Sequence, residues 1–496
     1  MRGHFFVSLL VVLGLLFGRG SVASAHVGSP DVFYEGDAGP YKLYVTIRPP
    51  EVIPGVADIQ IRAAQDDLTE LRIVPLPLSG DGAVFAPTPD QAARLVADPQ
   101  TFTGHLWMMT AGSWQVRILA DGRRGKGELA VPVPTLPQRT AGMQTALSVV
   151  LFALLLILVG GLLSIIGASS GEAQLTPGEA VTADIVRRRR RAQLVAALIL
   201  GLLLLGGARW WQTEARRAAE NVYRPLQMTA AVQDGRLELR LRSSGWQEQR
   251  LDDLLPDHDH LMHLFMLRVP EFEQIFHLHP SERAEGVFTV SLPAAPAGRY
   301  KLYADVVHAT GVPETLVAEL TLPDALAGTP LAGDDAAGQA PPLSQADPQR
   351  AASPLADGAR MVWQREPGEL VARAPGVFRF RVEDASGQPA TDLQLYMGML
   401  GHAAFVKRDG SVFAHVHPSG SVPMAALSLT ASAAAPAHHH QAGQLPAEVG
   451  FPYGFPSPGD YRIFIQIKRQ GRIETGVFDA HVSASSSAST SSAFRR

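Results

Sequence analysis

The chain has 496 residues, of which 46% are hydrophobic, and its formal net charge is −4. This length suits about two to four domains, and the absence of a basic patch on any folded segment argues against a nucleic-acid partner. The chain has no cysteine, which excludes disulfides, thiolate metal sites and c-type haem attachment. Any bound metal must therefore use histidine, methionine or carboxylate ligands.

Residues 1–25 have the pattern of a secretory signal peptide. Arg2 supplies the positive charge, FFVSLLVVLGLLF the apolar region, and Ala-Ser-Ala at 23–25 the small-residue cleavage site. Cleavage would leave His26 as the mature N-terminus, where the α-amine and the imidazole could chelate one metal ion together. The alternative is an uncleaved anchor helix.

Two further apolar runs, residues 143–167 and 192–211, are predicted to be transmembrane helices. The segment between them, residues 168–191, ends in five arginines, Arg187 to Arg191. Positively charged connections stay in the cytoplasm, so this segment is predicted to be a cytoplasmic loop. The regions on either side of the hairpin are then both expected outside the cytoplasm.

Three segments alternate apolar and polar residues in short runs separated by Pro and Gly, which is typical of β-sandwiches. They are the N-terminal segment (26–137), the middle segment (223–323) and the C-terminal segment (358–482). Residues 324–357, rich in Ala, Pro and Gly, are predicted to be a linker, and residues 483–496 a disordered tail. The predicted fold is mainly β: three immunoglobulin-like or cupredoxin-like sandwiches plus a two-helix transmembrane hairpin.

The middle and C-terminal segments read as diverged copies of each other. LMHLF corresponds to MGMLGHAAF, FHLHP to AHVHP, and GRYKLYADVV to GDYRIFIQIK. The C-terminal copy carries an insertion of roughly 30 residues, which includes His438, His439 and His440. The N-terminal segment shares only the final strand pattern, GSWQVRI.

Each copy has two histidines separated by one residue on a predicted strand. Residues i and i+2 of a strand share a face, so such a pair presents two imidazoles on the same side. An earlier histidine, one hairpin away, could supply a third ligand, which gives a three-histidine site suited to copper or zinc. The histidines concerned are His263, His277 and His279 in the middle segment, and His402, His415 and His417 in the C-terminal segment.

Other residues extend the list of candidate metal ligands. Thioether sulfur is a soft ligand that favours Cu(I). These further candidates are His258, His260, His308, Met397 and Met399. The alternative for all of them is a framework role, as hydrogen-bonded strand histidines and core methionines, and the alternative for His438–His440 is adventitious binding in a loop.

The N-terminal segment offers a separate candidate set: His26, His105 and Met108, followed by Met109. An amine, two imidazoles and one or two thioethers would suit both copper oxidation states. The alternative is that Met108 packs in the core near Trp107 and Trp114.

The stretch HVGSPDVFYEGDAGPYKLYVTI, followed by TAGSWQVRI, resembles the small extracytoplasmic YtkA-like sandwiches, which are similar to CopC-like periplasmic copper carriers. That resemblance implies copper binding through the mature N-terminal histidine, here His26, with His105 as a partner. The methionine-rich loop of the CopC type is reduced here to Met108 and Met109. The two HxHP copies resemble domains of membrane-attached bacterial proteins from copper and heavy-metal loci.

The chain is predicted to be a bacterial inner-membrane protein with periplasmic domains. Its predicted function is to bind copper, as Cu(I) or Cu(II), or else zinc. It would carry copper, confer resistance or deliver the ion to a periplasmic or membrane acceptor, with exposed ligands and a flexible linker favouring transfer. No catalytic motif is present, so an enzyme is not expected, although an amine-plus-histidine copper site at His26 would also suit a copper oxygenase. The alternative is a structural or assembly protein whose sandwiches dock a membrane partner.

Overall fold

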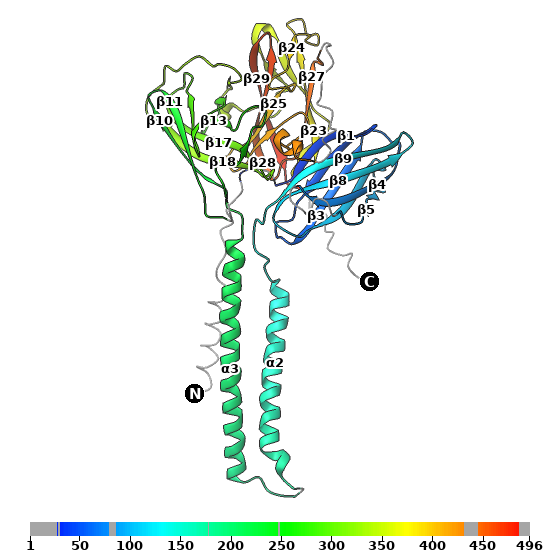
Figure 1. Ribbon diagram of the computed structural model, residues 1–496, viewed down its shortest axis with the longest axis vertical. Coiled ribbons are helices and arrows are strands. Elements are labelled where there is room, and N and C mark those ends of the chain that lie inside the picture. The colour runs from blue at the N-terminus through cyan, green and yellow to red at the C-terminus, as the bar shows by residue number, and fades with distance from the viewer. Residues whose placement is uncertain are drawn as a thin grey trace. The chain divides into compact units, whose positions relative to one another are not determined.

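The structure, a computed structural model, describes residue 27 and residues 30–78, 86–176, 178–246, 249–430 and 445–485. The chain divides into two compact units: Pro137–Tyr223 forms one, and Met1–Leu136 together with Arg224–Arg496 forms the other. Figure 1 shows that the first unit is helical and the second is built of strands. The predicted signal peptide, His26 and His438–His440 lie outside the described residues.

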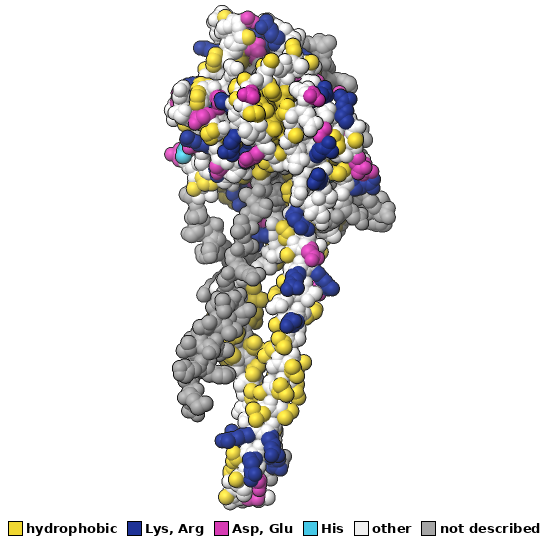
Figure 2. Space-filling view, turned by 90° about the vertical axis from the view of Figure 1, so that its left-hand side faces the viewer, with side chains coloured by type: hydrophobic (Ala, Val, Ile, Leu, Met, Phe, Trp, Pro, Cys, Tyr) yellow, Lys and Arg dark blue, Asp and Glu magenta, His cyan; other side chains and the backbone are white. Residues whose placement is uncertain are grey.

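The helical unit is a hairpin of α2 (Thr145–Ser170) and α3 (Ala183–Glu220), both long and apolar enough to cross a membrane. Helix α3 begins well before the predicted 192–211, because arginine is a good helix former and Arg187–Arg191 continues the helix instead of ending it. The connection is correspondingly shorter than the predicted loop 168–191. Apolar side chains cover the helices, and Lys and Arg side chains gather near the tip of the hairpin (Figure 2).

The N-terminal segment forms two antiparallel sheets, of strand order β1-β2-β3-β7-β6 and β5-β4-β8-β9. Alternate residues of β3 are buried, as the period of two predicts. Val45 and Ile59 of the first sheet and Val116 and Val131 of the second belong to one hydrophobic core. The strands are β1 (Val32–Ala38), β2 (Tyr41–Arg48), β3 (Gly55–Ala63), β4 (Leu68–Pro77), β5 (Asp90–Gln91), β6 (Ala93–Arg94), β7 (Thr101–Met108), β8 (Gly112–Gly122) and β9 (Gly125–Thr135).

The middle segment forms a sheet of order β10-β11-β16-β15 and a larger sheet of order β12-β17-β13-β14-β19, with β18 also paired to β17. Leu239 and Phe288 of the first sheet share a core with Leu264 and Leu302 of the second. The strands of this segment are β10 (Gln227–Gln233), β11 (Arg236–Arg242), β12 (Leu254–Leu255), β13 (His263–Val269), β14 (Gln274–Leu278), β15 (Ser281–Ala284), β16 (Val287–Ser291), β17 (Gly298–His308) and β18 (Pro313–Leu322).

The C-terminal segment repeats this plan. Its sheets have the orders β20-β21-β23-β27 and β22-β29-β28-β25-β26, with β24 also paired to β28, and share a core that includes Phe380 and Ile463. The elements are β20 (Ala352–Pro354), β21 (Arg360–Gln364), β22 (Leu370–Val371), β23 (Gly376–Glu383), β24 (Leu393–Gln394), β25 (His402–Lys407), β26 (Phe413–Val416), α4 (Met424–Ser428), β27 (Glu448–Tyr453), β28 (Gly459–Arg469) and β29 (Arg472–Ser483).

The register supports the predicted duplication. His263 of β13 lies opposite Asp305 of β17, and His402 of β25 lies opposite Gln466 of β28, at the same step of the corresponding strand pair. The predicted mainly β fold with two apolar helices is confirmed.

The segment predicted to be a linker, 324–357, contributes strands instead. Strand β19 (Ala336–Gln339) extends the larger sheet of the middle segment by pairing with β14, and β20 pairs with β21. Ala336 and Leu343 are buried. The composition predicted a linker because a segment of small residues cannot form a core by itself. Here the small residues pack closely against a neighbouring sheet, and the free edge of β14 supplies the hydrogen bonds that make the segment a strand.

The larger sheets of the middle and C-terminal segments pack on each other. A separate hydrophobic cluster joins Phe265 and Tyr303 of the middle segment to Ala404, Phe413 and Phe464 of the C-terminal segment. The stacked rings of Tyr303 and Phe413 have centroids 4.4 Å apart. Each larger sheet is therefore covered on both faces: one face lies on its own smaller sheet and the other on the second repeat.

Candidate metal centre

Strand alternation directs the histidines away from the core of their own segment. Leu264 and Leu278 point into the middle core, whereas His277 lies opposite Phe265, whose side chain belongs to the cluster between the two repeats. His263 precedes Phe265 by two residues and shares its face. The same alternation holds in β25 and β26, so both sets of histidines face the junction between the repeats.

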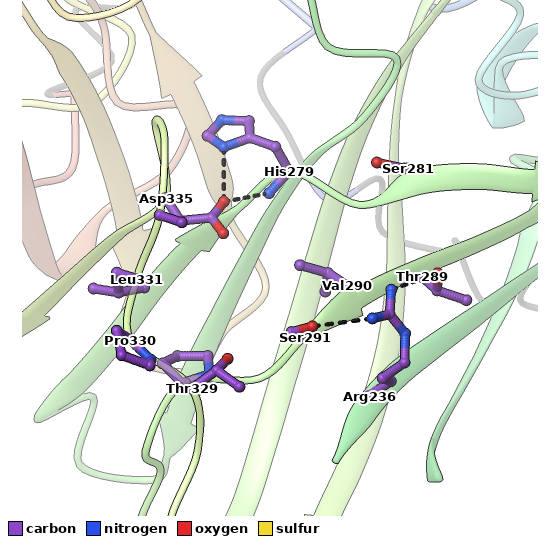
Figure 3. Close-up of a pocket in the computed structure, with 12 residues that line it drawn as sticks. Arg236, His279, Ser281, Thr289, Val290, Ser291, Thr329, Pro330, Leu331 and Asp335 are labelled. Carbon is purple, nitrogen blue, oxygen red and sulfur yellow. Dashed lines mark hydrogen bonds and ion pairs between the residues drawn. The ribbon is translucent and has the colours of Figure 1, made fainter. Parts of the chain in front are cut away.

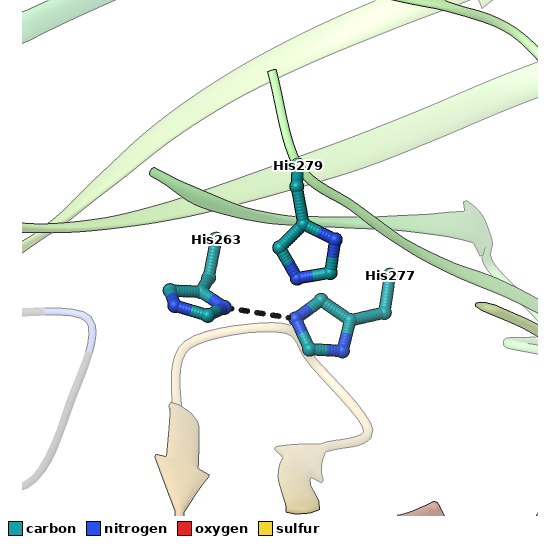
Figure 4. A group of neighbouring side chains, drawn as sticks. All are labelled: His263, His277 and His279. Carbon is teal, nitrogen blue, oxygen red and sulfur yellow. Dashed lines mark hydrogen bonds between the residues drawn. The ribbon is translucent and has the colours of Figure 1, made fainter. Parts of the chain in front are cut away.

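Three histidines of the middle segment, His263, His277 and His279, form what we call the middle triad (Figure 4). One ring nitrogen from each lies within 4.8 Å of the others. His263 Nδ1 and His277 Nε2 are 3.2 Å apart, the contact marked by the dashed line in Figure 4. Two nitrogens bound to one tetrahedral ion at about 2.0–2.1 Å would be about 3.3–3.4 Å apart, so this spacing fits ligands of a common ion.

Hydrogen bonds at the remaining ring nitrogens fix the tautomers of the triad. His263 Nε2 donates to the carbonyl oxygen of Asp257 at 3.0 Å. His277 Nδ1 lies 2.9 Å from Gln466 Oε1 and 3.3 Å from the hydroxyl oxygen of Tyr396, whose own proton goes to the carbonyl of Asp334. With Gln466 presenting its Oε1 atom, both groups accept, and the proton of His277 is assigned to Nδ1.

Asp335 fixes the third histidine. His279 Nδ1 and the His279 backbone N–H both donate to Asp335 Oδ1, at 3.0 and 2.9 Å, as Figure 3 shows. His279 Nε2 is left buried without a hydrogen-bond partner among the described residues. With all three rings neutral, lone pairs of His263 Nδ1, His277 Nε2 and His279 Nε2 converge. Lone pairs cannot hydrogen-bond to one another, so this arrangement favours a bound cation.

The C-terminal triad, His402, His415 and His417, repeats this geometry. His402 Nδ1 lies 3.2 Å from His415 Nε2, and His402 Nε2 donates to the carbonyl of Tyr396, which occupies the position of Asp257 in the other copy. His415 Nδ1 faces Asp305 Oδ2 at 3.4 Å. Among the described residues no carboxylate bonds to His417 as Asp335 bonds to His279, and the ring nitrogens of His417 have no hydrogen-bond partner of good geometry there.

Burial lowers the pKa of all six triad histidines, and charges on neighbouring histidines lower it further. The pKa is lowered to about 3 for His417. It lies well below the ordinary value for His263, His277, His402 and His415. The rings are therefore neutral at pH 7, the form that binds metal.

His258 and His260 lie beside the triads. The ring of His260 stacks on that of His279, with centroids 4.0 Å apart. His258 comes from the same turn yet lies 4.9 Å, between ring centroids, from His417 of the other repeat. Asp257, His258 and His417 form a third group with ligand atoms within 4.8 Å of one another.

His308 stands apart from both triads, in an ion-pair network. Its Nδ1 lies 2.8 Å from Asp253 and its Nε2 3.7 Å from Glu314. Arg469, at the same step of β28, lies between Asp392 and Glu474. A cation at this position in both copies indicates a framework role for His308.

We expect His308→Arg to preserve folding stability, because arginine already serves at the matching position. His308→Ala should cost about 1.5–3 kcal/mol by removing a charged hydrogen bond. Burial opposes the charge on His308, but the Glu314 and Asp253 carboxylates together outweigh it and raise the pKa of His308. The stabilisation from this charge is therefore complete below about pH 6.5 and is lost as the pH rises through the folded pKa. Urea unfolding at several pH values checks this, and a pH dependence unchanged in His308→Arg would contradict it.

The structure does not bring His105 and Met108 together. Met108 is fully buried in the core of the N-terminal segment, whereas His105 projects to solvent and pairs with Asp58 at 2.8 Å. The two lie three residues apart on β7, so they occupy opposite faces.

Met397 and Met399 lie in the turn that matches His258–His260. Tyr396 and Met399 form the same bridge there as Asp257 and His260 form in the middle segment.

Sequence reasoning missed the residues that orient the triads: Asp305, Asp335, Tyr396 and Gln466. Asp335 was hidden in a segment that looked like a linker. Asp305 and Gln466 occupy matching steps of the duplicated strand, which was a detectable signal, but their contacts run to the other repeat.

A substitution of Asp335 tests this orienting role. We expect Asp335→Asn to weaken metal binding at the middle triad by about 10–100-fold, since loss of such a partner costs that much elsewhere. Competition against a chromophoric chelator measures the affinity. Asp460→Asn, which alters the exposed His481–Asp460 pair, is the matched control, and equal affinities for the two variants would contradict the assignment.

Comparison with known proteins adds one family match. A family described as a domain of unknown function (DUF8832) matches residues 223–322 and 355–484, the two repeats that carry the triads. No curated protein matches the chain.

Similar solved structures include a tetra-tandem repeat in the extending region of a large adhesion protein, at 8% identity and TM-score 0.15, covering 87% of this chain and 71% of that chain. Salmonella alpha-2-macroglobulin reacted with methylamine has 6% identity and TM-score 0.19, covering 93% and 24%. Fibronectin(III)-like modules of Clostridium thermocellum CbhA have 8% identity and TM-score 0.19, covering 55% and 92%. At such TM-scores these similarities carry no argument.

Proposed function

We propose that the protein is a membrane-anchored, extracytoplasmic metal-binding protein that holds copper and delivers it to an acceptor. The observation that carries this proposal is the convergence of three imidazole lone pairs in the middle triad, each fixed by an acceptor at the opposite ring nitrogen. An arrangement that leaves lone pairs facing one another is costly in a metal-free core and favourable around a cation.

Copper is the proposed metal, with zinc as the alternative. Neutral imidazole suits both ions, and a chain without cysteine leaves histidine, methionine and carboxylate as the available ligands. Met397 and Met399, in the turn that matches His258–His260, are soft donors of the kind that Cu(I) prefers.

The helical unit supports the proposed location. Arg187–Arg191 lies near the connection of the hairpin, and the positive-inside rule places that end in the cytoplasm. Both strand-rich parts of the chain would then lie outside the cytoplasm, anchored to a bacterial inner membrane. We further propose that the three pairs of sheets are immunoglobulin-like or cupredoxin-like sandwiches, the first related to YtkA-like and CopC-like domains.

Burial of the triads favours retention of the ion over rapid exchange. His263, His277, His402 and His417 are at most 3% exposed, in contrast to the exposed ligands expected from the sequence. A pocket of about 210 Å³ reaches His279 and is also lined by Asp335, Ser281 and Arg236 (Figure 3). We propose that an ion reaches the middle triad past Asp335 and leaves the same way to a periplasmic or membrane acceptor.

Metal analysis of the purified full-length protein in detergent tests the proposal. After exposure to copper or zinc and removal of free metal, we expect stoichiometric copper by mass spectrometry. We expect its loss when His277, His279, His415 and His417 are all replaced by alanine. The control carries His105→Ala and His481→Ala, since these histidines are exposed, and should keep its copper. Wild-type protein without metal would contradict the proposal and favour a framework role for the histidines.

A further inference from the structure

The two triads meet at the junction of the repeats. The rings of His263 and His415 have centroids 5.3 Å apart, and those of His277 and His415 are 5.6 Å apart. His277 and His402 are separated by 6.2 Å. These distances between the triads are about as short as those within them, where His263 and His277 are 5.5 Å apart.

Each triad is oriented by the other repeat. Gln466 of the C-terminal segment accepts from His277, and Asp305 of the middle segment faces His415. Because Asp305 and Gln466 occupy the same step of the duplicated strand, the two contacts are reciprocal. Each triad therefore takes its three histidines from one repeat and an orienting partner from the other.

His258 extends this exchange, because with Asp257 and His417 it forms a group whose ligand atoms lie within 4.8 Å of one another. It belongs to the middle segment, but its ring lies 4.9 Å from His417 and 5.2 Å from His402, closer than the 6.2 Å to His263 of its own segment. His258 Nε2 is buried and has no hydrogen-bond partner among the described residues. His260, two residues further along the same turn, stacks on His279 of its own triad instead.

We propose that the two triads form one dinuclear metal centre shared by the repeats, in which His258 completes the C-terminal site as a fourth nitrogen ligand. This inference rests on the proposed function and adds to it the number of ions and their unequal surroundings. The middle site has three histidines, oriented in part by Asp335, and the C-terminal site has four. Two Cu(I) ions repel each other with a quarter of the Coulomb energy of two divalent ions at the same separation. The centre therefore holds two Cu(I) ions more readily than two divalent ions.

Anaerobic titration of the full-length protein with Cu(I), against a chromophoric chelator, tests the number of ions. Two ions per chain are expected for the wild type, and one each for His277→Ala/His279→Ala and His415→Ala/His417→Ala. A single ion in the wild type would overturn the dinuclear centre and leave copper binding in place. No bound ion would overturn the proposed function as well.

His258 is tested within the two double variants, each of which keeps one site. With only the C-terminal site left, His258→Ala should lower its affinity at least tenfold, although His258 lies in the other repeat. With only the middle site left, the same change should alter the affinity less than twofold. His260→Ala is the matched control and should spare the C-terminal site. An equal effect of His258→Ala in both backgrounds would overturn its assignment. Circular dichroism and thermal melting of each variant establish that it is folded.

Discussion

We expect the metal-free protein to lose stability steeply as the pH falls below about 6.5. Burial lowers the folded-state pKa of seven histidines, while in the unfolded chain each titrates near its ordinary value. Above pH 6.5 these histidines are neutral in both states and contribute no pH dependence. Below it the unfolded state binds more protons, so stability falls with falling pH. The seven are His258, His263, His277, His279, His402, His415 and His417.

The size of this effect follows from proton linkage. Each histidine that is protonated only in the unfolded state contributes about 1.4 kcal/mol per pH unit. Three such histidines would remove about 4 kcal/mol between pH 6 and 5, a large share of a typical stability of about 5–15 kcal/mol. Urea unfolding of chelator-treated protein at pH 7, 6 and 5 measures the slope. A double variant of the exposed His105 and His481 should keep the wild-type slope, and a flat profile for the wild type would contradict the expectation.

The second large effect is expected for Arg462→Met, at the junction of the repeats. Arg462 is 1% exposed and pairs with Asp479 at 2.9 Å. Its Nη1 also donates to the carbonyls of Glu271, Phe272 and Pro341, at 3.2, 3.3 and 2.6 Å. Loss of the guanidinium removes the ion-pair partner of the buried Asp479 and a donor from each of these carbonyls, which should cost about 3–5 kcal/mol.

Chemical unfolding followed by tryptophan fluorescence measures this loss. The control is Arg299→Met, because Arg299 and Glu319 are each 66% exposed and their pair should contribute less than about 1 kcal/mol. Adding Asp479→Leu to Arg462→Met should recover part of the stability, since it removes the uncompensated charge. Equal stabilities of the Arg462 and Arg299 variants would contradict the role of Arg462 in joining the repeats.

Local patterns in the sequence anticipated much of the fold. The period of two identified the strands, apolar length identified two helices, and the paired motifs identified the duplication. The arginine run and the Ala-Pro-Gly segment were misjudged for a common reason. Composition describes what a segment does alone, whereas α3 extends through the arginines and β19 depends on the edge of β14.

The sequence predicted the histidines within each triad but not the meeting of the two triads. That His277 and His279 share a face follows from strand geometry alone. That this face meets a second triad depends on contacts between residues such as His277 and Gln466, which are 189 positions apart. The same limit explains His258, whose sequence neighbours suggest one triad while its ring lies beside the other.

X-ray absorption spectroscopy of the copper-loaded, full-length protein tests the central claim most directly. We predict an inner shell of imidazole nitrogens with the multiple scattering typical of histidine, which disappears when His277, His279, His415 and His417 are replaced by alanine. An inner shell made mainly of oxygen, or one that the four substitutions leave unchanged, would contradict the claim that the two triads hold the metal.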